Sequence, residues 1–216
     1  MSVKVIIFDF DGTLADTLDA IVKITNRLAI EFGYKPTNPE ELAQIRNLSS
    51  REIVKKSGIS IFKIPFLLKK LKENLHDDIQ NLSPISGIKE ALIQLKDEGH
   101  VLGILTSNSE DNVRFFLKKQ GMLDLFSFIY SETTLFNKHR VLRRFMQQNH
   151  LSAEEIVYVG DETRDIEASK KIHVKVIAVS WGFNSREALA KQKPEFLIHK
   201  PSELIEVMVS LQQVVI

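Results

Sequence analysis

The stretch of sequence that decides the fold is residues 3–14, which read VKVIIFDFDGTL. Val3–Phe8 is a nearly continuous apolar run rich in β-branched residues, a pattern typical of a strand buried on both faces of a parallel sheet. Asp9 and Asp11 follow at its carboxyl end, and because side chains alternate along a strand, both are expected on the same side. Two like charges so close are unfavourable unless a cation neutralises them or one carboxyl holds a proton. The stretch therefore predicts either a ligand site or, more simply, a polar strand end and a turn.

Further apolar runs of the same character lie along the rest of the chain. They are Val101–Leu105, Ile156–Val159 and Val174–Val179, with Phe128–Tyr130 and Phe196–Ile198 as shorter candidates for strands near the edges of a sheet. Segments with helical periodicity stand between them, among them Ile88–Glu98 and Glu110–Lys119. Strands that alternate with helices of about 10–15 residues indicate an α/β fold with a doubly wound parallel sheet. In such sheets, ligands bind at the carboxyl ends of the strands.

Residues 17–83 break this alternation, because they contain no convincing strand. Four stretches there fit helical periodicity and are separated by glycine or proline: Leu18–Phe32, Pro39–Asn47, Ser50–Ser57 and Ile61–Leu75. A helical block placed directly after the first strand predicts a small all-α domain mounted on the sheet. We therefore expect residues 1–16 and 84–216 to form the α/β core domain and residues 17–83 to form the inserted helical domain.

The composition limits the classes of function. The chain has 216 residues, of which 44% are hydrophobic and 26% are charged, as in an ordinary globular protein. A formal net charge of +1 argues against a nucleic-acid partner bound through a basic surface. No window reaches the roughly 18 apolar residues of a membrane span, and the N-terminal apolar run is too short for a signal peptide. We expect a cytoplasmic protein, monomer or homodimer, without a membrane partner. The absence of cysteine excludes disulfides, thiolate metal sites and cysteine nucleophiles.

A second pair of acids follows the strand predicted at Ile156–Val159. Asp161 and Asp165 stand in the sequence GDETRD at residues 160–165, about one turn apart if a helix begins near Glu162. In a simpler interpretation, Asp161 caps that helix and Asp165 favours its N-terminal dipole. Together with the first pair, these carboxylates would form a hard, oxygen-rich site suited to Mg²⁺.

Two further features suit an anionic ligand. The strand predicted at Val101–Leu105 is followed by Thr106, Ser107 and Asn108. Hydroxyls and free backbone N–H groups ahead of a helix can hold a phosphate oxyanion, although Asn108 could equally cap that helix. Lys138 is predicted at the start of a helix, where the dipole disfavours a cation, and this misfit gives it a reason to have an anionic partner. The alternative for any single lysine is a solvated surface position.

Taken in chain order, these pieces resemble the four motifs of the haloacid dehalogenase superfamily. The motifs are Asp9-x-Asp11-Gly12-Thr13, then Thr106, then Lys138, then Gly160-Asp161-x-x-x-Asp165. The helical block at residues 17–83 resembles that superfamily's type 1 cap domain. Within the superfamily, the chain resembles phosphoglycolate-phosphatase-like hydrolases. The resemblance implies a Mg²⁺-dependent phosphatase that acts on a small phosphorylated metabolite.

The resemblance also implies a role for each motif residue. Asp9 would attack the phosphorus atom and form an aspartyl-phosphate. Asp11 would protonate the leaving alkoxide and then activate the water that hydrolyses the intermediate. Mg²⁺ would be held by Asp9, the main-chain carbonyl of Asp11 and Asp161, with Asp165 in support. The phosphoryl oxygens would be bound by Thr106, Ser107, Asn108 and Lys138.

Substrate choice is expected to lie in the cap. Arg46 and Arg51 end a loop that resembles the cap loop that related enzymes present to their substrate, and two arginines suit an anionic leaving group. Ser49 and Glu52 also have the spacing of a capping box, which gives the same loop a purely structural interpretation. Two alternative functions remain open: a phosphotransferase or mutase of the β-phosphoglucomutase type, and a catalytically silent binding or regulatory protein with the same fold.

Overall fold

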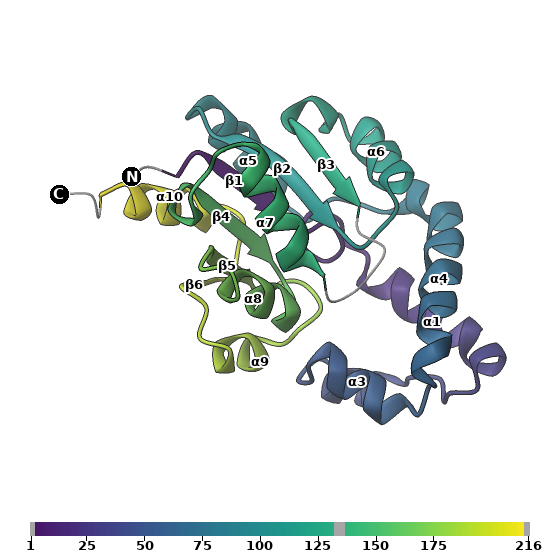
Figure 1. Cartoon of the computed structure of the whole chain (residues 1–216). Coiled ribbons are helices and arrows are strands. Elements are labelled where there is room, and N and C mark those ends of the chain that lie inside the picture. Colours follow the sequence, from purple (N-terminus) through teal and green to yellow (C-terminus); the bar gives the residue numbers. More distant parts are fainter. Residues whose placement is uncertain (1–2, 132–136, 214–216) are drawn as a thin grey trace.

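The computed structural model describes residues 3–131 and 137–213, and its centre is a six-stranded parallel sheet (Figure 1). The strands are β1 (Val5–Phe8), β2 (Val101–Thr106), β3 (Phe128–Ser131), β4 (Ile156–Gly160), β5 (Lys175–Val179) and β6 (Phe196–Ile198). Their order is β3-β2-β1-β4-β5-β6, and every neighbouring pair is parallel. The predicted doubly wound α/β sheet is therefore confirmed, and the two short strands lie at its edges as expected. The strand order reverses between β1 and β4, where sheets of this kind bind their ligands.

Helices cover both faces of the sheet. They are α5 (Ile88–Asp97), α6 (Glu110–Lys119), α7 (Lys138–Gln148), α8 (Thr163–Lys170), α9 (Arg186–Lys191) and α10 (Glu203–Gln213), with short 3₁₀ turns at Leu123–Leu125 and Ala153–Glu155. Ile6 and Val157 belong to the face covered by α5, α6 and α10, whereas Ile7 and Tyr158 belong to the face covered by α7, α8 and α9. Because consecutive residues of a strand point to opposite faces and both faces are buried, the strands read as continuous apolar runs.

The block between β1 and α5 is helical, as predicted, and its helices lie to one side of the α/β sheet (Figure 1). It contains α1 (Leu18–Phe32), α2 (Pro39–Ile45), α3 (Ser50–Ser57) and α4 (Ile64–Asp78), with 3₁₀ turns at Ile61–Lys63 and Ile79–Asn81. The helix expected from Ile61 becomes α-helical only at Ile64, because Pro65 lacks an N–H group and fits only the first turn. Ser49 and Glu52 form the expected capping box of α3. Among the described helices, none is long and apolar enough to span a membrane.

The chain leaves the α/β core and returns to it at adjacent points. The N–H of Asp16 donates to the carbonyl of Ser83 at 3.0 Å, and the N–H of Ile85 donates to the carbonyl of Leu14 at 2.9 Å. Ala15 and Pro84 form an antiparallel bridge between these bonds. The helical block is therefore attached through a short two-stranded connection, next to the end of β1.

Candidate active site

Three buried carboxylates meet at the carboxyl edge of the sheet. Asp9 follows β1, Asp161 follows β4, and Asp165 lies in the first turn of α8. Each contributes an oxygen, and these oxygens lie within 4.8 Å of one another. The register of β1 and β4 produces this meeting, because Phe8 pairs with Val159 and the N–H of Asp9 donates to the carbonyl of Val159 at 2.8 Å.

Lys138 is buried among these acids, with 2% of its surface exposed. Its Nζ donates to Asp9 Oδ2 at 2.5 Å, to Asp165 Oδ1 at 2.6 Å and to the Tyr158 hydroxyl at 2.9 Å. Burial lowers the pKa of Lys138, but the carboxylates of Asp165 and Asp9 raise it more, so its pKa lies above the ordinary value. Lys138 therefore has the anionic partners that its place at a helix N-terminus suggested, and the surface interpretation is wrong.

Both carboxylate oxygens of Asp161 accept hydrogen bonds from residues of the α/β core. The Thr13 hydroxyl donates to Oδ1 at 2.7 Å, and the N–H of Phe183 donates to Oδ2 at 2.7 Å. Asp161 does not cap α8, because the N-cap is Glu162, whose own N–H donates to Asp165 Oδ2 at 3.1 Å. The capping interpretation of Asp161 is therefore wrong, and its side chain is directed into the acidic cluster.

Two glycines leave room for the carboxylate of Asp161. Gly12 has a φ of +73°, and a Cβ there would lie 2.4 Å from Asp161 Oδ2. A Cβ on Gly182 would lie 2.3 Å from the Asp161 Cβ. A side chain at either position would displace the acid, which explains why glycine follows Asp11 in the first motif.

The acidic cluster fits a divalent cation. If all three carboxylates are ionised, they carry two negative charges more than the single charge of Lys138 balances, while Arg164 and Glu162 pair with each other at 2.5 Å. Burial and neighbouring carboxylates raise the pKa of Asp161 well above its ordinary value, and burial also raises the pKa of Asp165. Buried carboxylates without enough positive charge are costly, and a hard cation with oxygen ligands removes that cost.

Asp11 lies beside the cluster but has different contacts. Asn108 Nδ2 donates to its Oδ1 at 3.1 Å and to its Oδ2 at 3.2 Å. Removal from water raises the pKa of Asp11 to about 7, and the negative charge of Asp9 acts in the same direction. An acid with such a pKa can both give and take a proton near neutral pH.

The amide of Asn108 is oriented by a residue that the sequence did not single out. Asn112, buried in α6, donates from Nδ2 to Asn108 Oδ1 at 3.0 Å, which turns the Asn108 Nδ2 toward Asp11. Asn112 also bonds to α4, because its Nδ2 donates to the Lys72 carbonyl at 3.1 Å and its Oδ1 lies 2.7 Å from His76 Nδ1. A polar network therefore joins the helical block to Asp11.

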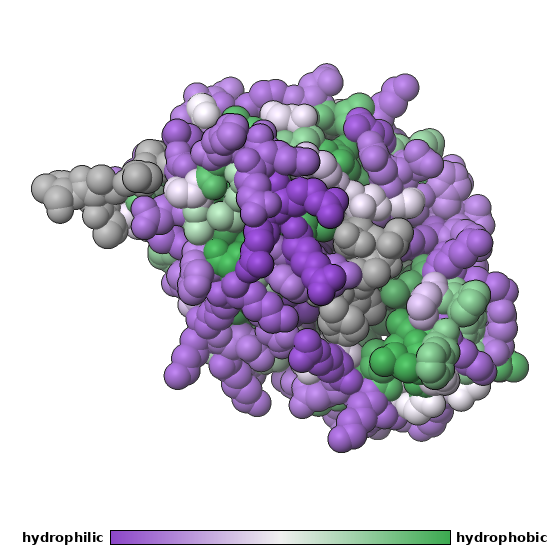
Figure 2. Space-filling view, viewed as in Figure 1, coloured by the Kyte–Doolittle hydropathy of each residue, from purple (hydrophilic) through white to green (hydrophobic). Residues whose placement is uncertain are grey.

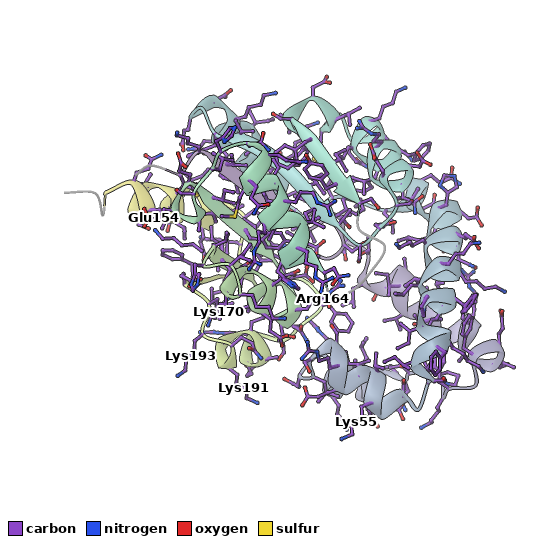
Figure 3. The ribbon with its side chains drawn as sticks, viewed as in Figure 1. Lys55, Glu154, Arg164, Lys170, Lys191 and Lys193 are labelled. Carbon is purple, nitrogen blue, oxygen red and sulfur yellow. The ribbon has the colours of Figure 1, made fainter. Side chains whose placement is uncertain are left out.

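The other residues after β2 lie at the same edge. Thr106 is buried, and its hydroxyl accepts the N–H of Asn108 at 2.9 Å. Ser107 lies on the surface of the site, where Arg164 approaches its Oγ at 3.5 Å. Arg164 is a second residue that the sequence did not single out, and it lies on the side of the core that faces the helical block (Figure 3).

A cavity of about 230 Å³ separates this edge of the sheet from the helical block. Its core side is formed by Asp11, Gly12, Ser107, Asn108, Asp161, Glu162, Arg164 and Phe183. Its helical side is formed by Thr17, Leu18, Ile21, Ser50, Ile53, Val54, Leu68, Leu71, Lys72 and Leu75. The cavity is therefore lined both by Asp11 and by Asp161 of the acidic cluster.

The two arginines predicted for the substrate lie elsewhere. Arg46 donates from Nε to the carbonyl of Phe183 at 2.8 Å and from Nη2 to the carbonyl of Gly182 at 2.9 Å. Arg51 borders a separate small depression that Lys138 and Arg164 also line. Within the described residues, neither arginine lines the 230 Å³ cavity, so their predicted contact with the substrate stays a prediction.

Comparison with known proteins places the chain in a family. The family model described as haloacid dehalogenase-like hydrolase matches residues 6–179. The chain belongs to the haloacid dehalogenase-like hydrolases. Among curated relatives, the phosphoglycolate phosphatase of Synechococcus elongatus is 39% identical over 210 residues, which are 97% of this chain and 99% of that protein. The pyrophosphatase PpaX of Bacillus thuringiensis is 26% identical and covers 96% of this chain and 97% of its own length.

Two solved structures share the fold. A predicted phosphatase from Clostridium acetobutylicum has a TM-score of 0.83 at 19% identity and covers 97% of this chain and 100% of its own. A putative β-phosphoglucomutase from Thermotoga maritima has a TM-score of 0.67 at 20% identity, over 96% and 99% of the two chains. At these identities the likeness concerns the fold alone. Family membership and full-length similarity to curated phosphatases make this protein a phosphatase, as the four motifs predicted.

Proposed function

We propose that this phosphatase hydrolyses a small phosphomonoester with the help of Mg²⁺ and through an aspartyl-phosphate on Asp9. The observation that carries the proposal is the buried cluster of Asp9, Asp161 and Asp165 around Lys138, next to a cavity into which Asp11 faces. The full-length relative from Synechococcus elongatus makes phosphoglycolate the first substrate to test.

Asp9 is positioned as the nucleophile. Its Oδ2 accepts from Lys138 and its Oδ1 accepts the N–H of Phe10 at 2.8 Å, so the carboxylate is fixed in one orientation. An oxygen of Asp9 forms a bond to phosphorus while the bond from phosphorus to the leaving oxygen breaks, and Asp11 gives its proton to that oxygen. Asp11 then takes a proton from a water molecule, whose oxygen attacks phosphorus, releases phosphate and restores the Asp9 carboxylate.

The residues that would hold Mg²⁺ are Asp9, the main-chain carbonyl of Asp11 and Asp161, with Asp165 in support. When bound, the metal reduces repulsion between the Asp9 carboxylate and an anionic phosphate and stabilises the charge of the transition state. Lys138, the first residue of α7, would also stabilise the negative charges of Asp9 and of the transition state. The phosphoryl oxygens would be held by Thr106, Ser107, Asn108 and Lys138.

The helical block, residues 17–83, would act as the cap over this site. The chain enters and leaves it at two adjacent segments, which are joined by the bridge between Ala15 and Pro84, and its inner wall faces the cavity. A cap in this place shields the aspartyl-phosphate from bulk water while the leaving group is bound.

Removal of Mg²⁺ tests the proposal directly. We expect EDTA to lower phosphate release from 2-phosphoglycolate or p-nitrophenyl phosphate by at least about 100-fold, and excess Mg²⁺ to restore it, because the metal contributes several kcal/mol to transition-state stabilisation. Independently of activity, Mg²⁺ at about 100 times its Kd is expected to raise the free energy of unfolding by about 2.7 kcal/mol.

The same assay separates the alternatives. β-Glucose 1-phosphate and pyrophosphate belong in the substrate panel, because isomerisation of the sugar phosphate would identify a mutase and preference for pyrophosphate would contradict a phosphomonoesterase. If no compound is turned over and Mg²⁺ leaves the unfolding curve unchanged, the protein is the catalytically silent alternative.

Replacement of Asn112 tests the contact that orients Asn108. We expect Asn112→Leu, which keeps the branched four-atom side chain but removes the hydrogen bonds, to lower kcat about 10-fold with little change in KM, because Asp11 is then held less well for proton transfer. The free energy of unfolding is measured in parallel, and a loss that appears in KM rather than kcat would contradict the positioning role. Asn149→Leu at an exposed site after α7 is the matched control.

A further inference from the structure

The loop between α2 and α3 is bonded to the core beside the acidic cluster. Arg46 follows α2, and its guanidinium donates to two consecutive carbonyls, from Nε to Phe183 at 2.8 Å and from Nη2 to Gly182 at 2.9 Å. The planar fork of an arginine suits such a pair of acceptors, and its charge strengthens both bonds. We call this contact, between residues 46–48 and residues 182–185, the clasp.

The core side of the clasp donates hydrogen bonds in return. The N–H of Ser185 donates to the Arg46 carbonyl at 2.8 Å, and the Ser185 hydroxyl donates to Asn47 Oδ1 at 2.6 Å. Asn184, with 1% of its surface exposed, donates from Nδ2 to the carbonyls of Arg46 and Leu48, each at 2.9 Å. The clasp therefore contains hydrogen bonds in both directions between the loop and the core.

Hydrogen bonds, rather than apolar packing, attach α2 and α3 to the core. Both helices are fully described, and neither contains a buried residue. The buried apolar cluster of the helical block belongs to α1 and α4 and consists of Ile24, Leu28, Phe32 and Leu75. Figure 2 shows hydrophobic side chains over the helical block at the lower right of the view, whereas the surface over α9 is hydrophilic. Because water replaces protein hydrogen bonds at a small net cost, a polar contact of this kind can open and close.

One peptide group connects Arg46 to Asp161. It consists of the Gly182 carbonyl, which accepts from Arg46, and the Phe183 N–H. That N–H donates to Asp161 Oδ2 at 2.7 Å. A cation at the carbonyl polarises the peptide group and makes its N–H a stronger donor. Because the group is planar, an arginine that fixes the carbonyl also fixes the direction of the N–H.

Asn184 provides a second link between the clasp and Asp161. Its N–H donates to the Asp161 carbonyl at 3.3 Å, and its Oδ1 accepts the N–H of Thr163, the first residue of α8, at 2.8 Å. The side chain that binds the loop of the helical block therefore also binds the backbone just after Asp161. The clasp thus contacts Asp161 both at its carboxylate and at its backbone.

We infer that the clasp couples docking of the helical block to the position of Asp161, with Arg46 as a positioning residue for that carboxylate. The inference rests on the proposed binding of Mg²⁺ by the acidic cluster and adds a means of regulating that site. With the block docked, Asp161 is oriented for the cation, and with the block released, the Phe183 N–H loses the charge that strengthens it. Coupling of this kind is reciprocal, so Mg²⁺ at Asp161 favours the docked block by the same factor.

The first measurement is the Kd for Mg²⁺, determined by calorimetry without substrate. We expect Arg46→Met to raise this Kd about 10- to 100-fold, as for other residues that orient a metal ligand. Arg46→Lys keeps the cation but not the fork, so its Kd is expected between the two, and this variant decides alone if Arg46→Met does not fold. Arg27→Met is the matched control, because Arg27 is exposed and pairs with Asp78 within the helical block at 3.4 Å. It is expected to change the Kd by less than about two-fold.

The second measurement is the distance between the helical block and the core. The chain has no cysteine, so spin labels can be attached through Lys55→Cys and Lys191→Cys. Lys55 of α3 and Lys191 of α9 are exposed, and Figure 3 shows them on the two sides of the clasp. We expect a broad distance distribution for metal-free Arg46→Met, and we expect saturating Mg²⁺ to narrow it, as reciprocal coupling requires.

The outcomes distinguish this inference from the function on which it rests. If the wild type does not bind Mg²⁺, the proposed metal site fails and the inference fails with it. If the wild type binds Mg²⁺ but the Kd of Arg46→Met is the same, Arg46 only attaches the helical block, and the inference alone is overturned, whatever the distance distribution. A KM of Arg46→Met for 2-phosphoglycolate that stays raised at saturating Mg²⁺ would make Arg46 a ligand of the substrate and would also overturn it.

Discussion

Replacement of Asp9 by asparagine is expected to lower kcat for phosphate release on the order of 10⁴-fold or more. An asparagine side chain has the shape of the aspartate but its amide oxygen does not attack phosphorus, so the aspartyl-phosphate cannot form. Steady-state phosphate release from 2-phosphoglycolate or p-nitrophenyl phosphate at saturating Mg²⁺ measures the effect. Acid quenching of the wild type in the first turnover, followed by mass analysis, should show a phosphoryl group on the peptide that contains Asp9.

Asp16→Asn is the matched control for this experiment. Asp16 lies seven residues further on, is exposed, and its backbone N–H, rather than its carboxylate, bonds to the carbonyl of Ser83. Its replacement is therefore expected to leave kcat within about two-fold of the wild type, since surface substitutions of this kind have small effects. Rapid hydrolysis by Asp9→Asn would rule out the covalent mechanism and would leave a directly activated water molecule as the nucleophile.

Most of the α/β core could be predicted from the sequence because buried parallel strands have an unmistakable pattern. β1 and β4 are short apolar runs, and the acids that follow them must meet once the two strands pair. An anionic partner for Lys138 could be predicted for a local reason, because the dipole disfavours a cation at a helix N-terminus, but its place beside these particular acids was implied only by the resemblance to the family motifs. The apolar pattern of a strand and the effect of a helix dipole each depend on residues that are close together in the chain. Both can therefore be recognised in the sequence.

Hydrogen bonds between segments that are far apart in the chain cannot be recognised in this way. Arg46 resembles a substrate ligand in sequence, but its guanidinium bonds to the carbonyls of Gly182 and Phe183, which lie more than a hundred residues away. Asn184 adds to this contact, because its Nδ2 donates to the carbonyls of Arg46 and Leu48, each at 2.9 Å. These bonds depend on the backbone conformation of two loops. The periodicity of the sequence does not predict that conformation.

Tyr158 and Asn112 illustrate a second limit. Tyr158 lies within a strand that is buried on both faces, so apolar periodicity does not show that its hydroxyl reaches Lys138. Asn112 reads as an ordinary polar residue in the first turn of α6, yet it is buried between α4 and Asn108. Buried polar side chains of this kind can be recognised only when the positions of their hydrogen-bond partners are known. Their effect on stability depends on whether each hydrogen bond is made.

The strongest effect on stability is expected at Lys138. We expect Lys138→Met to lower the free energy of unfolding by about 3–5 kcal/mol in metal-free buffer, because it leaves the buried carboxylates of Asp9 and Asp165 without their cation. The pKa of Lys138 is raised in the folded state, so the wild-type contribution is fully present at neutral pH and is lost only as the pH rises through that raised pKa. Urea unfolding at pH 7 measures the difference, with Lys118→Met, at an exposed position of α6, as the control.

The same variant separates the structural role of Lys138 from its catalytic role. If Asp9, Asp161 and Asp165 hold a divalent cation, Mg²⁺ should restore a larger share of stability in Lys138→Met than it adds to the wild type, since it meets carboxylates that have lost their lysine. Activity at saturating Mg²⁺ should nevertheless remain about 10²- to 10³-fold below the wild type, because a positioned donor to the phosphoryl group is missing. Full recovery of activity together with stability would show that Lys138 only balances charge, whereas stability that does not respond to Mg²⁺ would contradict metal binding by the acidic cluster.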